Sequence, residues 1–259
     1  MTFKKCALTS LLLTLGACSG TSCSRTYERP PITQEVRDRN DNNLNSDTIN
    51  EILDASVKIR SKYTYLENID DMTSIELKIK GSLGSGVVLY DDDKEEFYVI
   101  TANHVLPPKE IENGILLEQT VTAGEIEGEV IKRNEGIDLA LLKLTGGKFM
   151  PYTRKFAQDT NIGDYVIGAG FPSGGQKILF KGFISSYDIR DEVPVHTVID
   201  SSISPGDSGS GTYILQNGKA HLAGIVQVYY LNKRGQAGMS PLSYLRNFVK
   251  DTDIEDEYL

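Results

Sequence analysis

Short apolar segments separated by polar turns fill the chain from about residue 55 onward, a pattern typical of a β-sandwich or barrel. The first set of predicted strands is Ser56–Arg60, Gly86–Tyr90, Phe97–Thr101, Ile115–Val121, Gly128–Arg133 and Leu139–Leu144. The second set is Tyr165–Ala169, Ile178–Tyr187, His196–Asp200, Thr212–Leu215 and His221–Tyr229. The break near residues 145–160 divides the pattern into two halves. We therefore expect an all-β protein of two six-stranded antiparallel barrels, over about residues 55–145 and 160–240, each filled by its own side chains.

Two helices are expected outside the barrels. Apolar residues at helical spacing predict a short C-terminal helix over about residues 241–250. A second short helix is expected over Thr48–Ala55, with Ser46 or Asp47 as its cap. The folded domain is therefore expected over residues 51–259.

The N-terminus has the pattern of a secretory signal. Lys4 and Lys5 precede the apolar run Cys6–Leu15, which is shorter than the roughly 20 residues that a membrane-spanning helix needs. We expect a signal peptide over residues 1–17. The polar stretch 18–50 lacks apolar periodicity, as is typical of a flexible tether.

The end of this signal, Leu15-Gly-Ala-Cys18, resembles the bacterial lipobox, in which the cysteine is acylated. Cys18 is therefore the predicted lipidation site, and a plain cleaved signal is the alternative. Cys23 is a weaker anchor because Gly20 replaces the expected aliphatic residue. With Cys6 removed and Cys18 acylated, one thiol remains, so no intramolecular disulfide is expected. Ser19 gives no Asp-type retention signal, which favours the outer membrane and periplasm over the inner membrane.

Composition excludes one large class of function. The formal net charge is −9 and the sequence pI is about 4.9, whereas a nucleic-acid binder normally presents a basic surface. The three histidines have no metal-ligand spacing, and the cysteines form no cluster. We expect no nucleic-acid partner, no metal and no cofactor.

Three segments carry residues suited to nucleophilic catalysis: His104 after a buried strand, Asp138 at the head of another, and Ser208 in a glycine-flanked loop. A serine hydroxyl is a poor nucleophile at neutral pH unless a base takes its proton, and that base needs a partner that fixes its tautomer. Histidine suits the base because its unperturbed pKa, about 6.5, is close to neutrality. The glycines allow the amides of Gly206 and Ser208 to point together at a developing oxyanion.

These segments resemble the motifs of the trypsin-like serine proteases. The three motifs are Thr101-Ala-Asn-His104, Asp138-Leu-Ala-Leu-Leu and Gly206-Asp-Ser208-Gly. Further segments are similar to the bacterial HtrA/Deg branch: Gly84-Ser-Gly-Val-Val, Gly163-Asp-Tyr-Val-Ile-Gly-Ala-Gly-Phe-Pro172, Ile199-Asp-Ser-Ser-Ile-Ser-Pro-Gly and Gly224-Ile-Val. The order His, Asp, Ser also argues against a hydrolase with a nucleophile elbow, whose histidine comes last. About 50 residues follow Ser208, so a PDZ domain is not expected.

The resemblance implies a catalytic triad of His104, Asp138 and Ser208. It also implies a substrate pocket at Ser202, Gln227 and Tyr229, in which Gln227 replaces a Ser that usually supports the buried aspartate. A neutral pocket floor at Ser202, narrowed by Tyr229, predicts cleavage after small uncharged residues. No zymogen cleavage motif is visible, so the acidic residue before the nucleophile, Asp207, is expected to find a donor other than a new N-terminus or to lie exposed.

The sequence therefore predicts an exported serine endopeptidase that acts on polypeptides and is lipid-anchored in a bacterial cell envelope. The alternative is a catalytically inactive lipoprotein of the same fold that serves as a binding module, with Tyr229 blocking its cleft.

Overall fold

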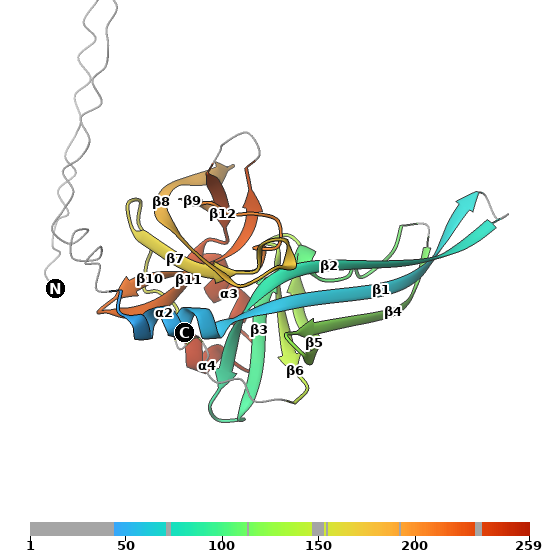
Figure 1. The fold of residues 1–259 in the computed structure, drawn as a ribbon, viewed down its shortest axis with the longest axis horizontal. Helices are drawn as coiled ribbons and strands as arrows, with labels where there is room; N and C mark the ends of the chain where they lie inside the picture. The colour runs from blue at the N-terminus through green and yellow to red at the C-terminus, as the bar shows by residue number, and fades with distance from the viewer. Residues whose placement is uncertain are drawn as a thin grey trace, which may run out of the picture. The chain divides into compact units, whose positions relative to one another are not determined.

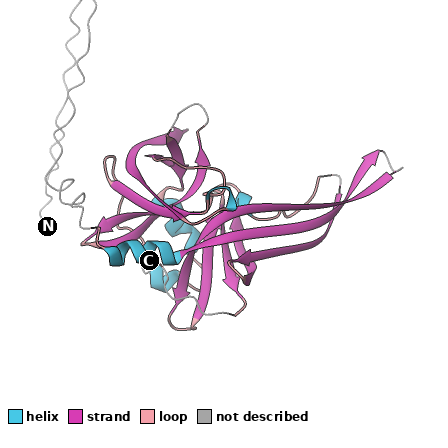
Figure 2. Cartoon of the chain, viewed as in Figure 1, coloured by secondary structure: helices cyan, strands magenta, loops and turns pink. Residues whose placement is uncertain are grey.

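The predicted strands fold into two closed six-stranded antiparallel barrels, which confirms the all-β fold class (Figure 1). The computed structural model describes residues 44–70, 74–112, 114–146, 153, 155–191, 193–230 and 235–259. The predicted signal peptide, Cys18, Cys23 and most of the predicted tether lie outside the described residues. In the described part of the chain, helices are few and strands dominate (Figure 2).

The first barrel has the strand order β1-β2-β3-β6-β5-β4 and the second the order β10-β11-β12-β9-β8-β7. The first barrel consists of β1 (Ser56–Asp70), β2 (Ser74–Asp91), β3 (Glu96–Ala102), β4 (Gly114–Ala123), β5 (Ile126–Asn134) and β6 (Leu139–Leu144). The second consists of β7 (Tyr165–Gly170), β8 (Ile178–Arg190), β9 (Val193–Asp200), β10 (Gly211–Gln216), β11 (Lys219–Tyr229) and β12 (Gln236–Met239). The helical segments are α2 (Ser46–Ala55), η1 (Asn103–Val105), η2 (Pro172–Gly174), α3 (Leu242–Val249) and α4 (Glu255–Tyr258).

Strand β6 shows why this fold needs a continuous apolar segment after Asp138. Leu139 and Leu141 belong to a cluster that includes residues of both barrels, whereas Ala140 and Leu142 belong to the interior cluster of the first barrel. Successive side chains of a strand point to opposite faces, so a strand buried on both faces must be apolar at every position. The expectation that each barrel is filled by its own side chains is thus incomplete, because the larger cluster is shared.

The main departure from the predicted strands is the length of β1 and β2. The sequence predicted only Ser56–Arg60 and Gly86–Tyr90, whereas the two strands pair from Ser56–Val87 out to Asp70–Ser74. They continue beyond the first barrel as an arm, with β4 paired to the other edge of β1 (Figure 1). In the arm, the exposed residues Ile75, Leu77 and Ile79 alternate with charged residues. This period of two is typical of a strand, but the sequence analysis did not use it.

The second barrel closes with a strand that the sequence analysis missed. Strand β12 has four residues and pairs with β11 and β9. It is too short to show the alternation on which strand prediction depends.

The start of the described chain differs from the prediction in its cap. Helix α2 begins at Ser46, and Asn45, rather than Ser46 or Asp47, caps it through its side chain, which accepts a hydrogen bond from Thr48 N at 2.8 Å. The last residues of the predicted tether are therefore helical. None of the helices in the described ranges is long and apolar enough to cross a membrane.

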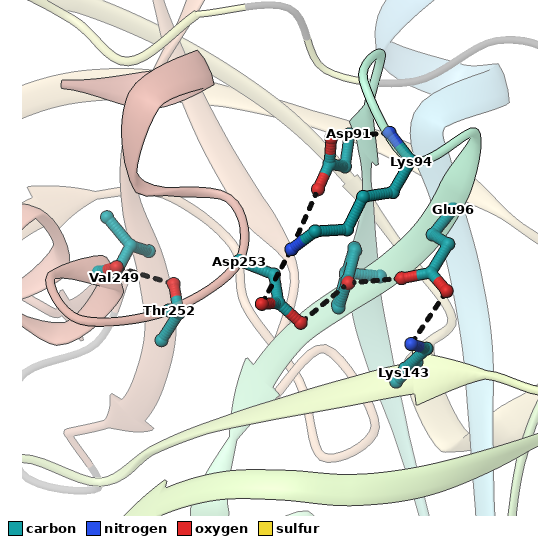
Figure 3. Close-up of polar contacts among 8 residues, drawn as sticks. Asp91, Lys94, Glu96, Lys143, Val249, Thr252 and Asp253 are labelled. Carbon is teal, nitrogen blue, oxygen red and sulfur yellow. Dashed lines mark hydrogen bonds and ion pairs between the residues drawn. The ribbon is translucent and has the colours of Figure 1, made fainter.

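The end of the chain is fastened to the first barrel. Asp253 pairs with Lys94 Nζ at 2.7 Å (Figure 3). It also accepts a hydrogen bond from Tyr98 Oη at 3.1 Å. Tyr258 Oη donates to Thr153 O at 2.6 Å and accepts from Tyr90 N at 3.0 Å. The predicted C-terminal helix is α3, and α4 is an addition that the sequence analysis did not identify.

Candidate active site

His104 and Asp138 are brought together by two hydrogen bonds. The carboxylate of Asp138 accepts one from His104 N at 2.9 Å and one from His104 Nδ1 at 2.7 Å. A carboxylate only accepts, so the ring proton lies on Nδ1 and the Nε2 lone pair is left free. That tautomer is the one that a general base beside a serine requires.

The backbone at Asp138 has an unusual conformation. Its φ is 51°, in the left-handed region that residues other than glycine seldom adopt. The preceding turn is held by the side chain of Asn134, whose Oδ1 accepts hydrogen bonds from Gly136 N at 3.0 Å and Ile137 N at 3.3 Å. Asp138 O then accepts from Asn103 N at 3.2 Å. The turn therefore aims the carboxylate at the histidine before β6 begins.

The turn that carries His104 is fixed by groups that the sequence analysis did not single out. Val105 O accepts hydrogen bonds from Ser61 Oγ at 3.1 Å and from Ser82 Oγ. Arg133 donates from Nε to Asn103 Oδ1 at 2.8 Å and from Nη1 to Pro107 O at 3.0 Å. These contacts join segments far apart in the sequence, so no local pattern could have revealed them.

Ser208 follows a tight turn. Asp207 N donates to Ser204 O at 3.0 Å, and the two central residues are Pro205 and Gly206, the latter with a φ of 99°. Proline followed by a residue of positive φ is the signature of a type II turn. A Cβ on Gly206 would also lie 2.5 Å from Phe171 O, so only glycine fits here.

The amides of Gly206 and Ser208 donate no hydrogen bond to any residue that the structure describes. Pro205 O accepts from Ser173 N at 2.6 Å. The carbonyl and the N–H of one trans peptide point in opposite directions, so Gly206 N–H points away from Ser173. Ser85 supports this arrangement, because its Oγ donates to Gly206 O at 2.8 Å and accepts from Phe171 N at 3.0 Å.

Strand β2 lies between the histidine turn and the serine loop. A Cβ on Gly84 would lie 2.5 Å from Val105 Cγ1 and 3.0 Å from Ser208 O, and Ser85 N donates to Ser208 O at 2.8 Å. Within the described ranges, neither Ser208 Oγ nor His104 Nε2 takes part in a hydrogen bond. The side chains of His104 and Ser208 are therefore not hydrogen-bonded to each other in this structure.

Asp207 is buried, with 4% of its surface exposed, so of the two expected alternatives the one in which it finds another donor holds. Its donor is a backbone amide, Ser204 N, at 3.0 Å from Oδ2. No ion pair to Asp207 is present among the described residues. Burial raises the pKa of this carboxyl above its usual value.

Ser202 and Tyr229 line one pocket of about 310 Å³. Its other described lining residues are Ser201, Ile203, Tyr230, Gly235 and Gln236. Tyr229 is 44% exposed, so it forms part of the rim. Gln227 is not in this pocket: its Nε2 lies 2.6 Å from Ile137 O and 2.9 Å from Asp138 O. The assignment of Gln227 to the substrate pocket is thus wrong, because its side chain turns toward the first barrel.

A larger cavity of about 940 Å³ opens beside His104. Its lining includes the charged residues Lys80, Lys109, Glu110, Arg133 and Glu135. No group of three or more metal-ligating side chains occurs in the part of the chain that the structure describes.

The family model for the trypsin-like peptidase domain matches residues 84–224, just over half of the sequence, and the chain belongs to this family. A probable periplasmic serine endoprotease, DegP-like, of Pseudomonas putida is 26% identical over 164 residues, which cover 61% of this chain and 32% of that protein. The magnetosome formation protease MamE of Magnetospirillum gryphiswaldense is 28% identical over 181 residues, which cover 66% of this chain and 22% of MamE. The chain thus spans a third or less of the length of these relatives.

Solved structures support the fold. The Rv3671c protease from M. tuberculosis in its active form aligns with a TM-score of 0.56 at 22% identity, over 78% of this chain and 82% of that chain. An HtrA-type protease with a decapeptide aligns with a TM-score of 0.59 at 18% identity, over 77% and 64%. The resemblance to the trypsin-like family and its HtrA/Deg branch is confirmed.

Proposed function

We propose that the protein is a serine endopeptidase in which Ser208 is the nucleophile, His104 the general base and Asp138 the residue that orients the base. The observation that carries the proposal is the pair of hydrogen bonds that the backbone and ring of His104 donate to the carboxylate of Asp138, which leaves Nε2 free. A free Nε2 on an oriented imidazole adds no contact that stabilises the fold, but it can accept a proton as a general base.

In the proposed reaction, Ser208 Oγ attacks the carbonyl carbon of a peptide bond while His104 Nε2 takes its proton. The oxyanion then accepts hydrogen bonds from Gly206 N and Ser208 N, the two amides without a partner in the described structure. His104 returns the proton to the leaving amine as the C–N bond breaks. Water, deprotonated by the same imidazole, then hydrolyses the ester on Ser208.

The pocket at Ser202 and Tyr229 supports a preference for small uncharged residues on the acyl side of the scissile bond. None of its described lining residues is charged, so a buried Lys, Arg, Asp or Glu of the substrate would lack a counter-ion there. Cleavage of a peptide library should therefore enrich Ala, Val and Ser at that position, and enrichment of charged residues would contradict the assignment.

The proposed location is the bacterial cell envelope, with a lipid anchor on Cys18. Two observations support it: the signal-like N-terminus with its lipobox-like ending, and relatives described as periplasmic. The mature domain would then act on polypeptides at or near a membrane surface.

Labelling with a fluorophosphonate probe tests the proposed function. Wild-type protein should be labelled, and Ser208→Ala should lose both the label and about 10⁵–10⁶-fold in turnover. Ser204→Ala, a change of an exposed serine in the same loop, should keep both. A folded wild type that takes no label would refute the proposal and favour the catalytically inactive binding module.

A further inference from the structure

We infer that Lys58 is a positioning residue for the oxyanion turn, residues 204–207, because its ammonium group holds the segment to which this turn is hydrogen-bonded. The inference deepens the proposed function and rests on it, since it concerns an amide that would bind the oxyanion. Lys58 lies on β1 in the first barrel, whereas the segment that it holds is η2, which follows β7 of the second. The contact therefore joins the two barrels beside the site.

The ammonium group of Lys58 is held at two points. Its Nζ donates a hydrogen bond to Gly174 O at 2.6 Å, and hydrogen bonds from an ionised donor are roughly twice as strong as neutral ones. Nζ also lies 5.2 Å from the centroid of the Phe171 ring, within the range of a cation–π interaction. Because the side chain is half-buried, these two groups replace part of the water around the charge.

The backbone of η2 is strained where Lys58 binds it. Ser173 and Gly174 have φ values of 52° and 65°, so two successive residues lie in the left-handed region. For a serine this conformation is costly and persists only where the surroundings impose it. Within the turn, Gly174 N donates to Phe171 O at 2.8 Å. The Lys58 ammonium adds a contact from outside the turn, at Gly174 O.

The strained segment holds the oxyanion turn directly. Ser173 N donates to Pro205 O at 2.6 Å, and this carbonyl belongs to the same peptide unit as Gly206 N–H. Since the two groups of a trans peptide point in opposite directions, the position of Ser173 determines where Gly206 N–H points. The packing is close, because a Cβ on Gly206 would lie 2.6 Å from Ser173 N and 3.1 Å from Gly174 N. A displacement of η2 would therefore displace the amide that binds the oxyanion.

A second lysine connects this cluster to helix α2. Lys177 Nζ lies 5.5 Å from the centroid of the Phe171 ring and donates a hydrogen bond to Leu53 O in the last turn of α2. The ring of Phe171 thus lies near two ammonium groups, one from β1 and one that also binds α2. At Asp207 the oxyanion turn has no ion pair among the described residues. The positive charges that support this turn therefore act through η2.

Removing the ammonium group while keeping the length of the side chain tests this role. Lys58→Met should lower kcat about 5- to 50-fold and leave KM within about twofold, a smaller loss than that of a deleted oxyanion donor because Gly206 N remains. Lys62→Met is the matched control, since Lys62 is exposed on the same strand, and it should leave kcat unchanged. Lys58→Arg, which keeps the charge and can still donate to Gly174 O, should recover most of the loss.

A pair of inhibitors separates positioning of the oxyanion site from a general effect on structure. Ser208 Oγ adds to the carbonyl carbon of a peptide aldehyde while His104 takes the hydroxyl proton, which places a negative oxygen at the oxyanion site. The corresponding peptide alcohol binds the same cleft without this step. Lys58→Met should weaken binding of the aldehyde about 5- to 50-fold and that of the alcohol less than about twofold. Equal losses for the two inhibitors, or no loss for either, would overturn the inference.

The same measurements distinguish a failure of this inference from a failure of the proposed function. A wild type that binds the alcohol but forms no hemiacetal with the aldehyde would refute the proposed function. Denaturant unfolding shows whether Lys58→Met is folded. If it is not, Lys58→Gln takes its place, because its amide is a donor of shorter reach. A selective loss of aldehyde binding in that variant supports the inference, and a loss shared by both inhibitors overturns it.

Discussion

Replacing Ser85 with alanine should slow the enzyme because it loosens the turn that presents the oxyanion amides. The side chain is fully buried, and its hydroxyl joins Gly206 O to Phe171 N through hydrogen bonds of 2.8 and 3.0 Å. It thereby connects β2, the nucleophile loop and the segment that holds Pro205 O. No other described side chain bridges Gly206 and Phe171.

The magnitude follows from what the alanine leaves behind. One carbonyl and one amide lose their partner, and an unpaired buried polar group costs about 1–3 kcal/mol. Both groups are partly buried, so we expect the free energy of unfolding to fall by about 1–3 kcal/mol in total. Gly206 N itself remains. The loss in kcat should therefore stay below the roughly 10²- to 10³-fold of a deleted oxyanion donor, at about 10- to 100-fold.

The assay is steady-state hydrolysis of a chromogenic peptide, with denaturant unfolding measured on the same samples. Ser56→Ala is the control, since Ser56 Oγ is also buried and donates to Ile52 O at 2.7 Å at the end of α2. It should lose about 1 kcal/mol of stability with kcat unchanged. If Ser85→Ala also kept the wild-type kcat while losing stability, the idea that this hydroxyl positions the oxyanion amides would be refuted.

Two further predictions concern the carboxyl beside the nucleophile and the lipid anchor. Burial raises the pKa of Asp207, so this group favours the folded state while protonated, and that stability is lost as the pH rises through its folded-state pKa. Asp207→Asn, which can still accept from Ser204 N, should therefore raise the melting temperature relative to wild type more at about pH 8 than at about pH 4; a pH-independent difference in thermal unfolding would contradict this. Cys18→Ser should abolish incorporation of radiolabelled palmitate and move the protein from the detergent phase to the aqueous phase. Retention of the label would show that the anchor lies elsewhere, and Cys23 would be the next site to test.

The sequence by itself determined the fold class and the segments of the candidate site. These features have local causes: a segment buried on both faces, such as Leu139–Leu142, must be apolar at every position. A turn with positive φ next to Phe171 O demands Gly206. Such requirements restrict the residue types at neighbouring positions, so the motifs around His104, Asp138 and Ser208 can be recognised in the sequence.

The tertiary structure alone decided which residues support these segments. Ser85, Arg133 and Gln227 act by donating to backbone carbonyls or side chains of distant segments, and a polar residue in a strand looks the same in sequence whatever it binds. The long arm of β1 and β2 did leave a signal in the sequence, because Ile75, Leu77 and Ile79 alternate with charged residues. Only the structure shows that this arm pairs out to Asp70–Ser74 and that helix α4 forms, because the stability of both segments comes from pairing and docking across the fold.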